Sequence, residues 1–350
     1  MVASSSEFFV IKGASTYAFK LLAKQILATV FGIGIALIVA KIDYNFWRKP
    51  VVIVGLFLLT CLLLGYALIH PPIHGTHRWI KIGPLTLQPS HIAKYVTVIV
   101  FANWFEDINR TKNFMHGIAP ALLSLGIIGI LIGLEPSIGM LFIILSVSIL
   151  MLFAAGVRLS QIGFITSSLG GVILFLINKV PYATKRFMGF INNGHEQVTQ
   201  SILGIGSGGI FGKGLGEGFT KKFFLPLPHT DFIFSTIAEE WGLVGSIGIL
   251  FAFFVILWRG ISIALNSKDR FSMLCAFGIT LTIFIQAMLH IGVACGVCPP
   301  TGIPLPFISA GGSGLVTNFF ALGILLSISK KAQNGINTSP GTEWSLRNEK

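Results

Sequence analysis

The chain has 350 residues, of which 53% are hydrophobic and 11% are charged, and its mean hydropathy is +0.81. Soluble domains carry roughly 25% charged residues, so this composition excludes an ordinary soluble protein and indicates an integral membrane protein. The net charge of +12 would suit nucleic acid. Basic residues in short loops on one side of the membrane account for much of it, so we expect no nucleic-acid partner.

Nine apolar stretches predict an all-α polytopic fold with nine transmembrane helices. Most have the length of about 20 residues that crosses the hydrocarbon core of a bilayer. The third stretch is short and carries Lys94, so it spans only if its ends extend into the loops or if Lys94 has a partner. The stretches are 25–40, 51–69, 92–104, 117–134, 138–155, 162–178, 242–258, 271–294 and 314–329.

Lysine and arginine in the short loops predict the orientation, because cytoplasmic loops carry an excess of them. With Lys330 and Lys331 inside, every short loop on that side is basic. Residues 1–331 are expected to form one membrane domain, and 332–350 a disordered polar tail. The N-terminus then lies outside although it has no apolar segment of a signal peptide. The inner basic residues are Lys41, Arg48, Lys49, Arg110, Lys112, Arg158, Arg259, Lys268 and Arg270.

Three long segments, 70–91, 179–241 and 295–313, fall on the outer side. Loops presented by a rigid bundle commonly carry function, so we expect the site there. These segments contain more basic residues than topology requires, which indicates either an anionic partner or solvated loop charge. The residues are Arg78, Lys81, Lys179, Lys185, Arg186, Lys213, Lys221 and Lys222.

Two further motifs carry little catalytic signal. The glycine run at 204–218, "GIGSGGIFGKGLGEG", lacks the preceding strand and the GK[ST] of a phosphate loop, so close backbone approach to a lipid headgroup or between helices is favoured. Cys61 and Cys275 lie in apolar runs and are expected to pack in the core. For Cys295 and Cys298, "CGVC", packing and an outer-face disulfide both stay open.

The acidic residues are the strongest signal from the residues themselves. Of only 13 Asp and Glu, four lie near the outer ends of membrane segments: Asp231, Glu239, Glu240 and Glu135. Ionisable groups at a bilayer are costly and are retained where they pair or act. A single aspartate in "FFLPLPHTDFIF" suits a general base, or proton coupling in a transporter. The alternative is structural: an ion pair with a basic residue, either Lys94, Lys185, Arg186 or Lys222. No Ser-His-Asp triad or histidine metal motif stands out.

Four longer blocks resemble the SEDS family (shape, elongation, division and sporulation), in order and spacing over about residues 20 to 330. The blocks are "HRWIKIGPLTLQPSHIAK", "QSILGIGSGGIFGKGLG", "FFLPLPHTDFIFSTIAEEWGLVG" and "PPTGIPLPFISAGGSGL". They look closer to the division-type branch than to the elongation-type branch. The resemblance implies a ten-helix fold whose outer cavity binds lipid II. It also implies a peptidoglycan glycosyltransferase that transfers a growing glycan from undecaprenyl pyrophosphate onto the next disaccharide.

The resemblance also implies roles for particular residues. Asp231 matches the family's essential aspartate and is expected to deprotonate the acceptor hydroxyl, with inversion at the anomeric carbon. Outer cations are expected to stabilise the leaving pyrophosphate, and His229 to tune the surroundings of Asp231. No cofactor is required, but a divalent cation, Mg²⁺ or Mn²⁺, stays open. The expected substrate-binding residues are Arg78, Lys94, Arg186, Gln200, Lys222, His229, Glu239 and Ser309.

The implied partners are lipid II, a class B penicillin-binding protein that crosslinks the strands, other divisome proteins and the membrane. The implied location is the bacterial cytoplasmic membrane, multi-pass, with the active face outward. Two alternatives stay open: a lipid II flippase, and a division scaffold with weakened activity. Broken helices and charges at the membrane midplane would favour the flippase, but the acidic residues here gather at the outer face.

The chain departs from the family pattern in three places. His91 stands where the family usually has Glu, and Ser137 stands where it usually has Asp. Lys94 therefore loses its usual neighbour at i−3, and we expect it to pair with Glu135, Glu239 or Asp231. From the resemblance we also expect the family's first helix to be missing from this sequence, because residues 1–20 resemble the outer loop that would follow it.

Overall fold

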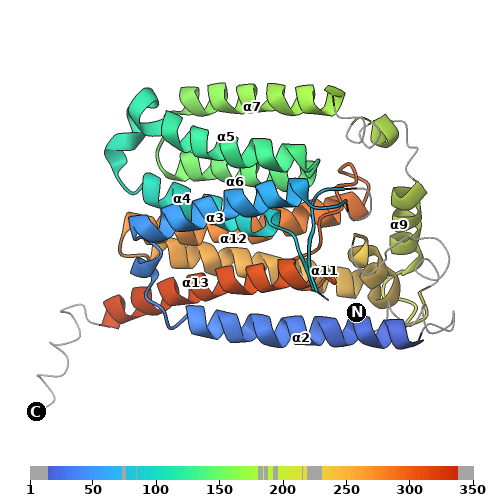
Figure 1. The fold of residues 1–350 in the computed structure, drawn as a ribbon. Helices are drawn as coiled ribbons and strands as arrows, with labels where there is room; N and C mark the ends of the chain where they lie inside the picture. The colour runs from blue at the N-terminus through green and yellow to red at the C-terminus, as the bar shows by residue number, and fades with distance from the viewer. Residues whose placement is uncertain are drawn as a thin grey trace, which may run out of the picture.

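A computed structural model describes residues 15–72, 76–83, 85–179, 184, 188–191, 196–214, 216–218 and 231–337. Long helices run side by side in a bundle, and α9 lies across one end of it (Figure 1). The helices are α2 (Ser15–Val39), α3 (Pro50–Ile69), α4 (Ser90–Trp104), α5 (Ala119–Leu134), α6 (Ile138–Ala154), α7 (Leu159–Lys179), α9 (Glu196–Ser207), α11 (Ile233–Leu265), α12 (Arg270–Ala294) and α13 (Gly312–Asn337).

Each of the nine predicted apolar stretches coincides with one of these helices, so the all-α polytopic class is confirmed. Six segments of the described chain are long and apolar enough to cross a membrane, and α6 is apolar but shorter. Helix α13 extends to Asn337, beyond the predicted start of the tail at residue 332. The six segments are Leu22–Val39, Pro50–Ile69, Phe114–Leu134, Ile233–Leu265, Arg270–Ala294 and Gly312–Gln333.

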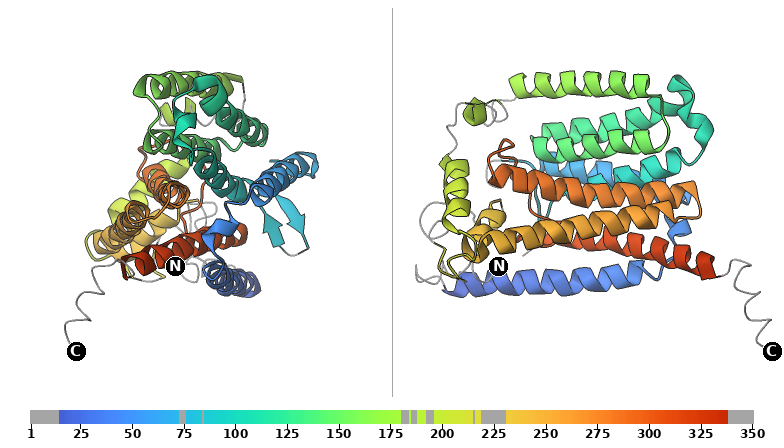
Figure 2. Two further views of the ribbon diagram at one scale, coloured as in Figure 1. Left: turned by 90° about the vertical axis from the view of Figure 1, so that its left-hand side faces the viewer. Right: turned by 180° about the vertical axis from the view of Figure 1, so that it is seen from behind.

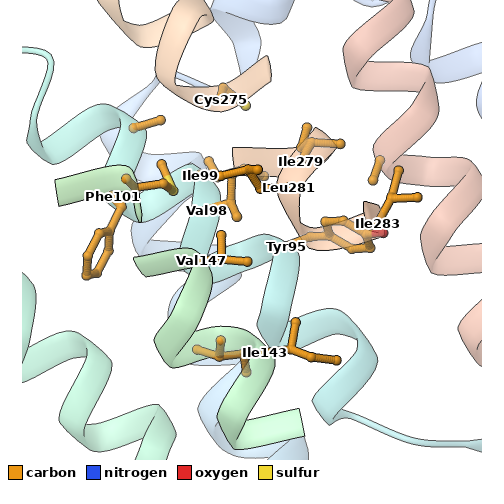
Figure 3. Packing of buried hydrophobic residues seen from close by; sticks show 14 of the residues in the cluster. Tyr95, Val98, Ile99, Phe101, Ile143, Val147, Cys275, Ile279, Leu281 and Ile283 are labelled. Atoms are coloured by element: carbon orange, nitrogen blue, oxygen red, sulfur yellow. The ribbon is translucent and has the colours of Figure 1, made fainter. Parts of the chain in front are cut away.

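The core forms where α4, α6 and α12 meet. Figure 3 shows Tyr95 and Val98 of α4, Val147 of α6, and Ile279 and Ile283 of α12 packed together. Helix α4 is only 15 residues long and is buried along almost its whole length. It is enclosed by protein instead of lipid, so the short third stretch needs no lipid-facing surface. Helices α2 and α3 instead expose many large apolar side chains, as lipid-facing helices do.

The basic loops meet at one end of the bundle, as predicted. Arg48 beside α3 pairs with Glu106 after α4, and Lys331 of α13 pairs with Asp43 after α2, at 2.6 Å. The described parts of the three segments expected on the outer side come together at the other end, where α9 lies (Figure 2). Ser201 of α9, for example, donates to the carbonyl of Ala294 at the end of α12, at 2.8 Å.

The first outer segment folds as a β-hairpin, which the sequence interpretation missed. Strands β1 (Ile80–Ile82) and β2 (Leu85–Leu87) pair antiparallel, with Lys81 opposite Thr86. Gly83 adopts a φ of +59° in the turn, a conformation that glycine takes without strain. The hairpin leads directly into α4 and holds Arg78 over the outer end of the bundle.

Candidate functional site

Asp231 lies at the outer end of the bundle, two residues before the first residue of α11, Ile233. Its side chain is half-buried. The next residue, Phe232, is buried against Val198 of α9 and Val293 of α12. This packing fixes the backbone that carries Asp231. The predicted residues Arg186, Lys222 and His229 lie outside the described residues.

Glu239, two turns further along α11, is buried and forms an ion pair. The Lys213 amine lies 3.0 Å from its Oε1 atom and also donates to the Ser207 hydroxyl, at 2.8 Å. Our alternative interpretation of these acids as ion-paired groups holds for Glu239, although the partner differs from the candidates. The role of Glu239 in substrate binding stays a prediction.

The glycine run packs against the middle of α11, which accounts for its composition. The backbone N–H groups of Lys213 and Gly214 donate to the carbonyls of Glu239 and Glu240, at 3.0 and 3.1 Å. A Cβ atom at Gly212 would overlap the Glu240 carbonyl. At this point α11 kinks at Gly242, whose φ is +64°. The expected close backbone approach between helical segments is therefore confirmed.

The expected pairing of Lys94 with an acid is wrong. Lys94 is buried, and its amine donates to the side-chain oxygens of Gln286 at 2.5 Å and Asn318 at 2.9 Å. No carboxylate of the described chain forms an ion pair with it. Neutral amides on α12 and α13 take the place of the acid, and Asn318 also accepts from the Tyr95 hydroxyl. The sequence signal for both amides is a polar residue inside an apolar span.

Ser309 shapes the loop beside these amides. Its hydroxyl accepts a hydrogen bond from the Leu305 N–H at 2.8 Å, which closes a turn of the loop before α13. Ser309, Gln286 and Asn318 line a small cavity. The structure therefore brings Ser309 close to the partners of Lys94. Gln200 is half-buried on α9, away from the residues that line this cavity.

Arg78 is the other predicted cation that the structure places in detail. Its Nε atom donates to the carbonyl of Glu135 at 2.9 Å, and its Nη2 atom donates to the carbonyl of Pro136. Both carbonyls belong to the turn between α5 and α6. Arg78, His91 and Ser137 line a second cavity, next to the first.

The two cavities do not fit a divalent cation. Mg²⁺ and Mn²⁺ prefer carboxylate oxygens, and neither lining contains a carboxylate. Within the ranges that the structure describes, no three His, Cys, Asp or Glu side chains come together as metal ligands. The four cysteines are free, and Cys275 packs in the apolar core as expected. Cys298, for which packing and a disulfide were both open, packs against apolar residues.

The geometry defines a class: a polytopic helical membrane protein with a carboxylate, Asp231, and basic side chains gathered at one end of its bundle. The model of the cell cycle protein family that comprises FtsW, RodA and SpoVE matches residues 1–334. The chain belongs to this family, which confirms the SEDS resemblance.

Several curated relatives are similar over most of their length. The probable peptidoglycan glycosyltransferase FtsW of Geobacter metallireducens is 38% identical, over 89% of this chain and 86% of the relative. Stage V sporulation protein E of Bacillus subtilis is 35% identical, over 88% and 86%. The probable FtsW of Coxiella burnetii is 34% identical, over 91% and 88%. The prevalence of FtsW agrees with the predicted division-type branch.

Solved structures show the same fold. A structure described as showing structural coordination of polymerization and crosslinking by a peptidoglycan synthase complex matches with a TM-score of 0.77 and 25% identity, covering 94% of this chain and 95% of that one. The rod shape determining protein RodA of Thermus thermophilus matches with a TM-score of 0.68 and 25% identity, covering 95% and 93%.

Proposed function

We propose that this chain polymerises lipid II into glycan strands at the outer face of the bacterial cytoplasmic membrane during cell division. The observation that carries the proposal is the position of Asp231. It is a half-buried carboxylate at the outer end of the bundle, on a backbone anchored by Phe232. Family membership and relatives that are named peptidoglycan glycosyltransferases support the same activity.

In the proposed reaction Asp231 acts as the general base. It takes the proton of the 4-hydroxyl of the acceptor disaccharide, whose oxygen attacks the anomeric carbon of the donor glycan. The bond from that carbon to the pyrophosphate oxygen breaks, and its electron pair leaves with undecaprenyl pyrophosphate. A positioned base typically contributes about 10²–10⁴-fold to such a step. Attack opposite to the leaving group inverts the anomeric centre.

The partner proposed for this activity is a class B penicillin-binding protein, which would crosslink the strands. The supporting observation is the likeness in fold to a component of a peptidoglycan synthase complex. Other divisome proteins are proposed on the similarity to FtsW relatives.

The test is polymerisation of fluorescent lipid II by the purified chain with its cognate transpeptidase, read as a ladder on a gel. We expect Asp231→Asn to reduce polymerisation at least about 100-fold, because the amide accepts no proton. The control is Asp107→Asn, which changes an exposed aspartate at the opposite end of the bundle. Full activity of Asp231→Asn would contradict the role of the base. Transport of lipid II without any ladder from the wild type would favour the flippase.

A further inference from the structure

The "CGVC" motif follows α12 at the outer end of the bundle and has no part in the proposed polymerisation. Both of its thiols, Cys295 and Cys298, are free in the structure. Cys295 is the C-cap residue of α12 and is exposed, while Cys298 is half-buried. Two thiols this close in the chain can be oxidised to a disulfide in an oxidising compartment.

The backbone after α12 folds back over the last turn of the helix. Gly296 adopts a φ of +73° directly after the C-cap residue, where glycine is free of strain. Its N–H donates to the carbonyl of Val293 at 3.1 Å, and the N–H of Val297 donates to the carbonyl of Gly292 at 2.8 Å. These two hydrogen bonds define a Schellman motif, one of the common ways in which a helix ends.

The Schellman motif brings Cys298 back beside Gly292, which lies one turn before Cys295. The N–H of Cys298 donates to the carbonyl of Gly292 at 3.1 Å, and a Cβ atom at Gly292 would lie 3.1 Å from the Cys298 Sγ atom. The Cα–Cβ bonds of a helix tilt toward its amino end, so that of Cys295 tilts toward the same glycine. We therefore expect the two cysteine Cα atoms to lie within the roughly 7 Å that a disulfide requires.

The same turn supports the backbone that carries Asp231. Cys298 packs against a small apolar cluster formed by Val198 of α9, Phe232 and Val293 of α12. Phe232 directly follows Asp231 in the chain. Cysteine sulfur behaves as a small apolar group, and a disulfide adds no charge, so oxidation is compatible with this packing. A link to Cys295 would fix the turn on which the cluster rests.

The surroundings of the two thiols favour the disulfide over the dithiol. Burial raises the pKa of both the Cys295 and the Cys298 thiol. The negative end of the α12 dipole also opposes a thiolate, whereas the amino end of a helix stabilises one. A CxxC pair is strongly oxidising when its reduced form is stabilised. Here neither thiolate is stabilised, so the disulfide should resist reduction once it has formed.

We propose that Cys295 and Cys298 are an oxidation site and form an intrachain disulfide that fixes the turn after α12. The co-reactant is a small-molecule or protein disulfide on the outer side of the membrane. That the motif faces this oxidising side rests on the orientation in the proposed function.

The reaction is a thiol–disulfide exchange in two steps. The exposed Cys295 loses its proton, and its sulfur attacks one sulfur of the co-reactant, which releases the other as a thiolate. Cys298 then loses its proton and attacks the Cys295 sulfur of this mixed disulfide, and the second thiolate leaves. The two cysteines are oxidised by two electrons, and the co-reactant is reduced to two thiols.

The test is the number of free thiols in the full-length chain, isolated from membranes without reductant. The chain is equilibrated with oxidised glutathione, denatured, alkylated with N-ethylmaleimide and weighed intact. We expect two maleimide adducts, at Cys61 and Cys275, and four adducts after reduction with dithiothreitol. The control Cys61→Ser should give one adduct before reduction and three after it. Four free thiols, or glutathione retained on either cysteine of the motif, would overturn the proposal.

Thermal melting tests whether the bond fixes the turn. Dithiothreitol should lower the melting temperature of the oxidised wild type in detergent by about 2–4 °C, because a disulfide restricts the unfolded chain. The double variant Cys295→Ser with Cys298→Ser should melt at the same temperature with and without dithiothreitol. An unchanged melting temperature on reduction of the oxidised wild type would overturn the stabilising role of the bond.

A membrane-impermeant maleimide tests the location. In spheroplasts it should label Cys295 only after reduction. Labelling without reduction would overturn the disulfide in the cell, and protection in both states would overturn the outward orientation.

The thiol count separates this inference from the proposed function. An oxidised wild type that never polymerises lipid II would refute the proposed function alone. A wild type that polymerises lipid II with four free thiols would refute this inference alone.

Discussion

At the scale of single residues, Lys94 shows how a membrane protein keeps a buried cation without an acid. Two amide oxygens, from Gln286 and Asn318, stabilise the amine without cancelling its charge. Gln286 in turn donates to the carbonyl of Pro304 at 2.7 Å, in the loop before α13. Lys94 therefore connects α4, through one side chain, to the loop that borders both cavities.

Glu135 gives a pH prediction at the same scale. It lies in the short turn between α5 and α6, fully buried, and neither carboxylate oxygen has a hydrogen-bond partner. Burial raises its pKa from 4.5 to about 8, although Arg78 opposes this. The folded chain thus keeps a proton that the unfolded chain loses, and stability should fall as the pH rises from about 4.5 to about 8.

Glu135→Gln should remove this dependence on pH and stabilise the protein at pH 8, by on the order of 2 kcal/mol. The measurement is the melting temperature in detergent between pH 5 and pH 9. Arg78, whose guanidinium donates to the Glu135 carbonyl, stays protonated over this pH range and is unchanged in the variant. Glu217→Gln, at an exposed carboxylate, is the control. Parallel pH profiles for wild type and Glu135→Gln would show that Glu135 does not titrate as described.

At the scale of elements, the contact between the glycine run and α11 holds Glu239 in place. Alanine at position 212 is disfavoured for two reasons. Its Cβ atom would overlap the Glu240 carbonyl, and the φ of +81° at this position is one that residues other than glycine rarely adopt. We expect Gly212→Ala to separate the two segments and to destabilise the chain by about 2–4 kcal/mol. The adjacent hydrogen bond from the Lys213 N–H to the Glu239 carbonyl would break with it.

The matched control is Gly206→Ala. Gly206 lies within α9, and a Cβ atom there would meet nothing within 4 Å. Alanine inside a helix is favoured over glycine by about 0.5–1 kcal/mol, so this variant should melt at the same temperature or slightly higher. Thermal melting of the two variants tests the contact. Equal melting temperatures for Gly212→Ala and the wild type would show that the segments do not pack as closely as described.

Elements differ in how far the sequence predicts them. Long apolar stretches predict helices because a membrane requires about 20 apolar residues, and all nine stretches lie in helices. The hairpin was missed although "IKIGPLTL" alternates around a glycine, because its strands have only three residues each. The partners of Lys94 were also missed. Gln286 and Asn318 lie 192 and 224 residues further along the chain, and only tertiary packing brings them together.

The residues of the candidate site were likewise predictable from the sequence only in part. Asp231 was singled out by its rarity and its motif, and it lies two residues before α11, whose first turn is at the same end of the bundle as α9. Its catalytic role stays a prediction. The resemblance drew attention to His91 and Ser137 only as departures from a pattern. That both line one cavity with Arg78 depends on contacts among four separate segments. No local pattern in the sequence encodes such an arrangement.

At the scale of the whole molecule, the inner end holds the core helices in register. Arg270, at the start of α12, donates from Nε to the carbonyl of Phe105 at 2.9 Å and from Nη2 to the carbonyl of Ala155 at 2.5 Å. These are the C-cap residues of α4 and α6. One guanidinium therefore satisfies the last carbonyls of two helices and meets the negative ends of both dipoles. The three helices that it joins are the ones that form the core in Figure 3.

Arg270→Ala should destabilise the whole bundle by about 2–4 kcal/mol, because two half-buried carbonyls lose charged donors together. Arg270→Lys should recover less than half of the loss, since a single amine cannot reproduce the planar fork of donors. Thermal melting of both variants in detergent is the measurement, with Lys268→Ala, at an exposed lysine of the same loop, as the control. Full recovery by lysine would mean that charge alone is sufficient and that the planar fork of donors is not needed.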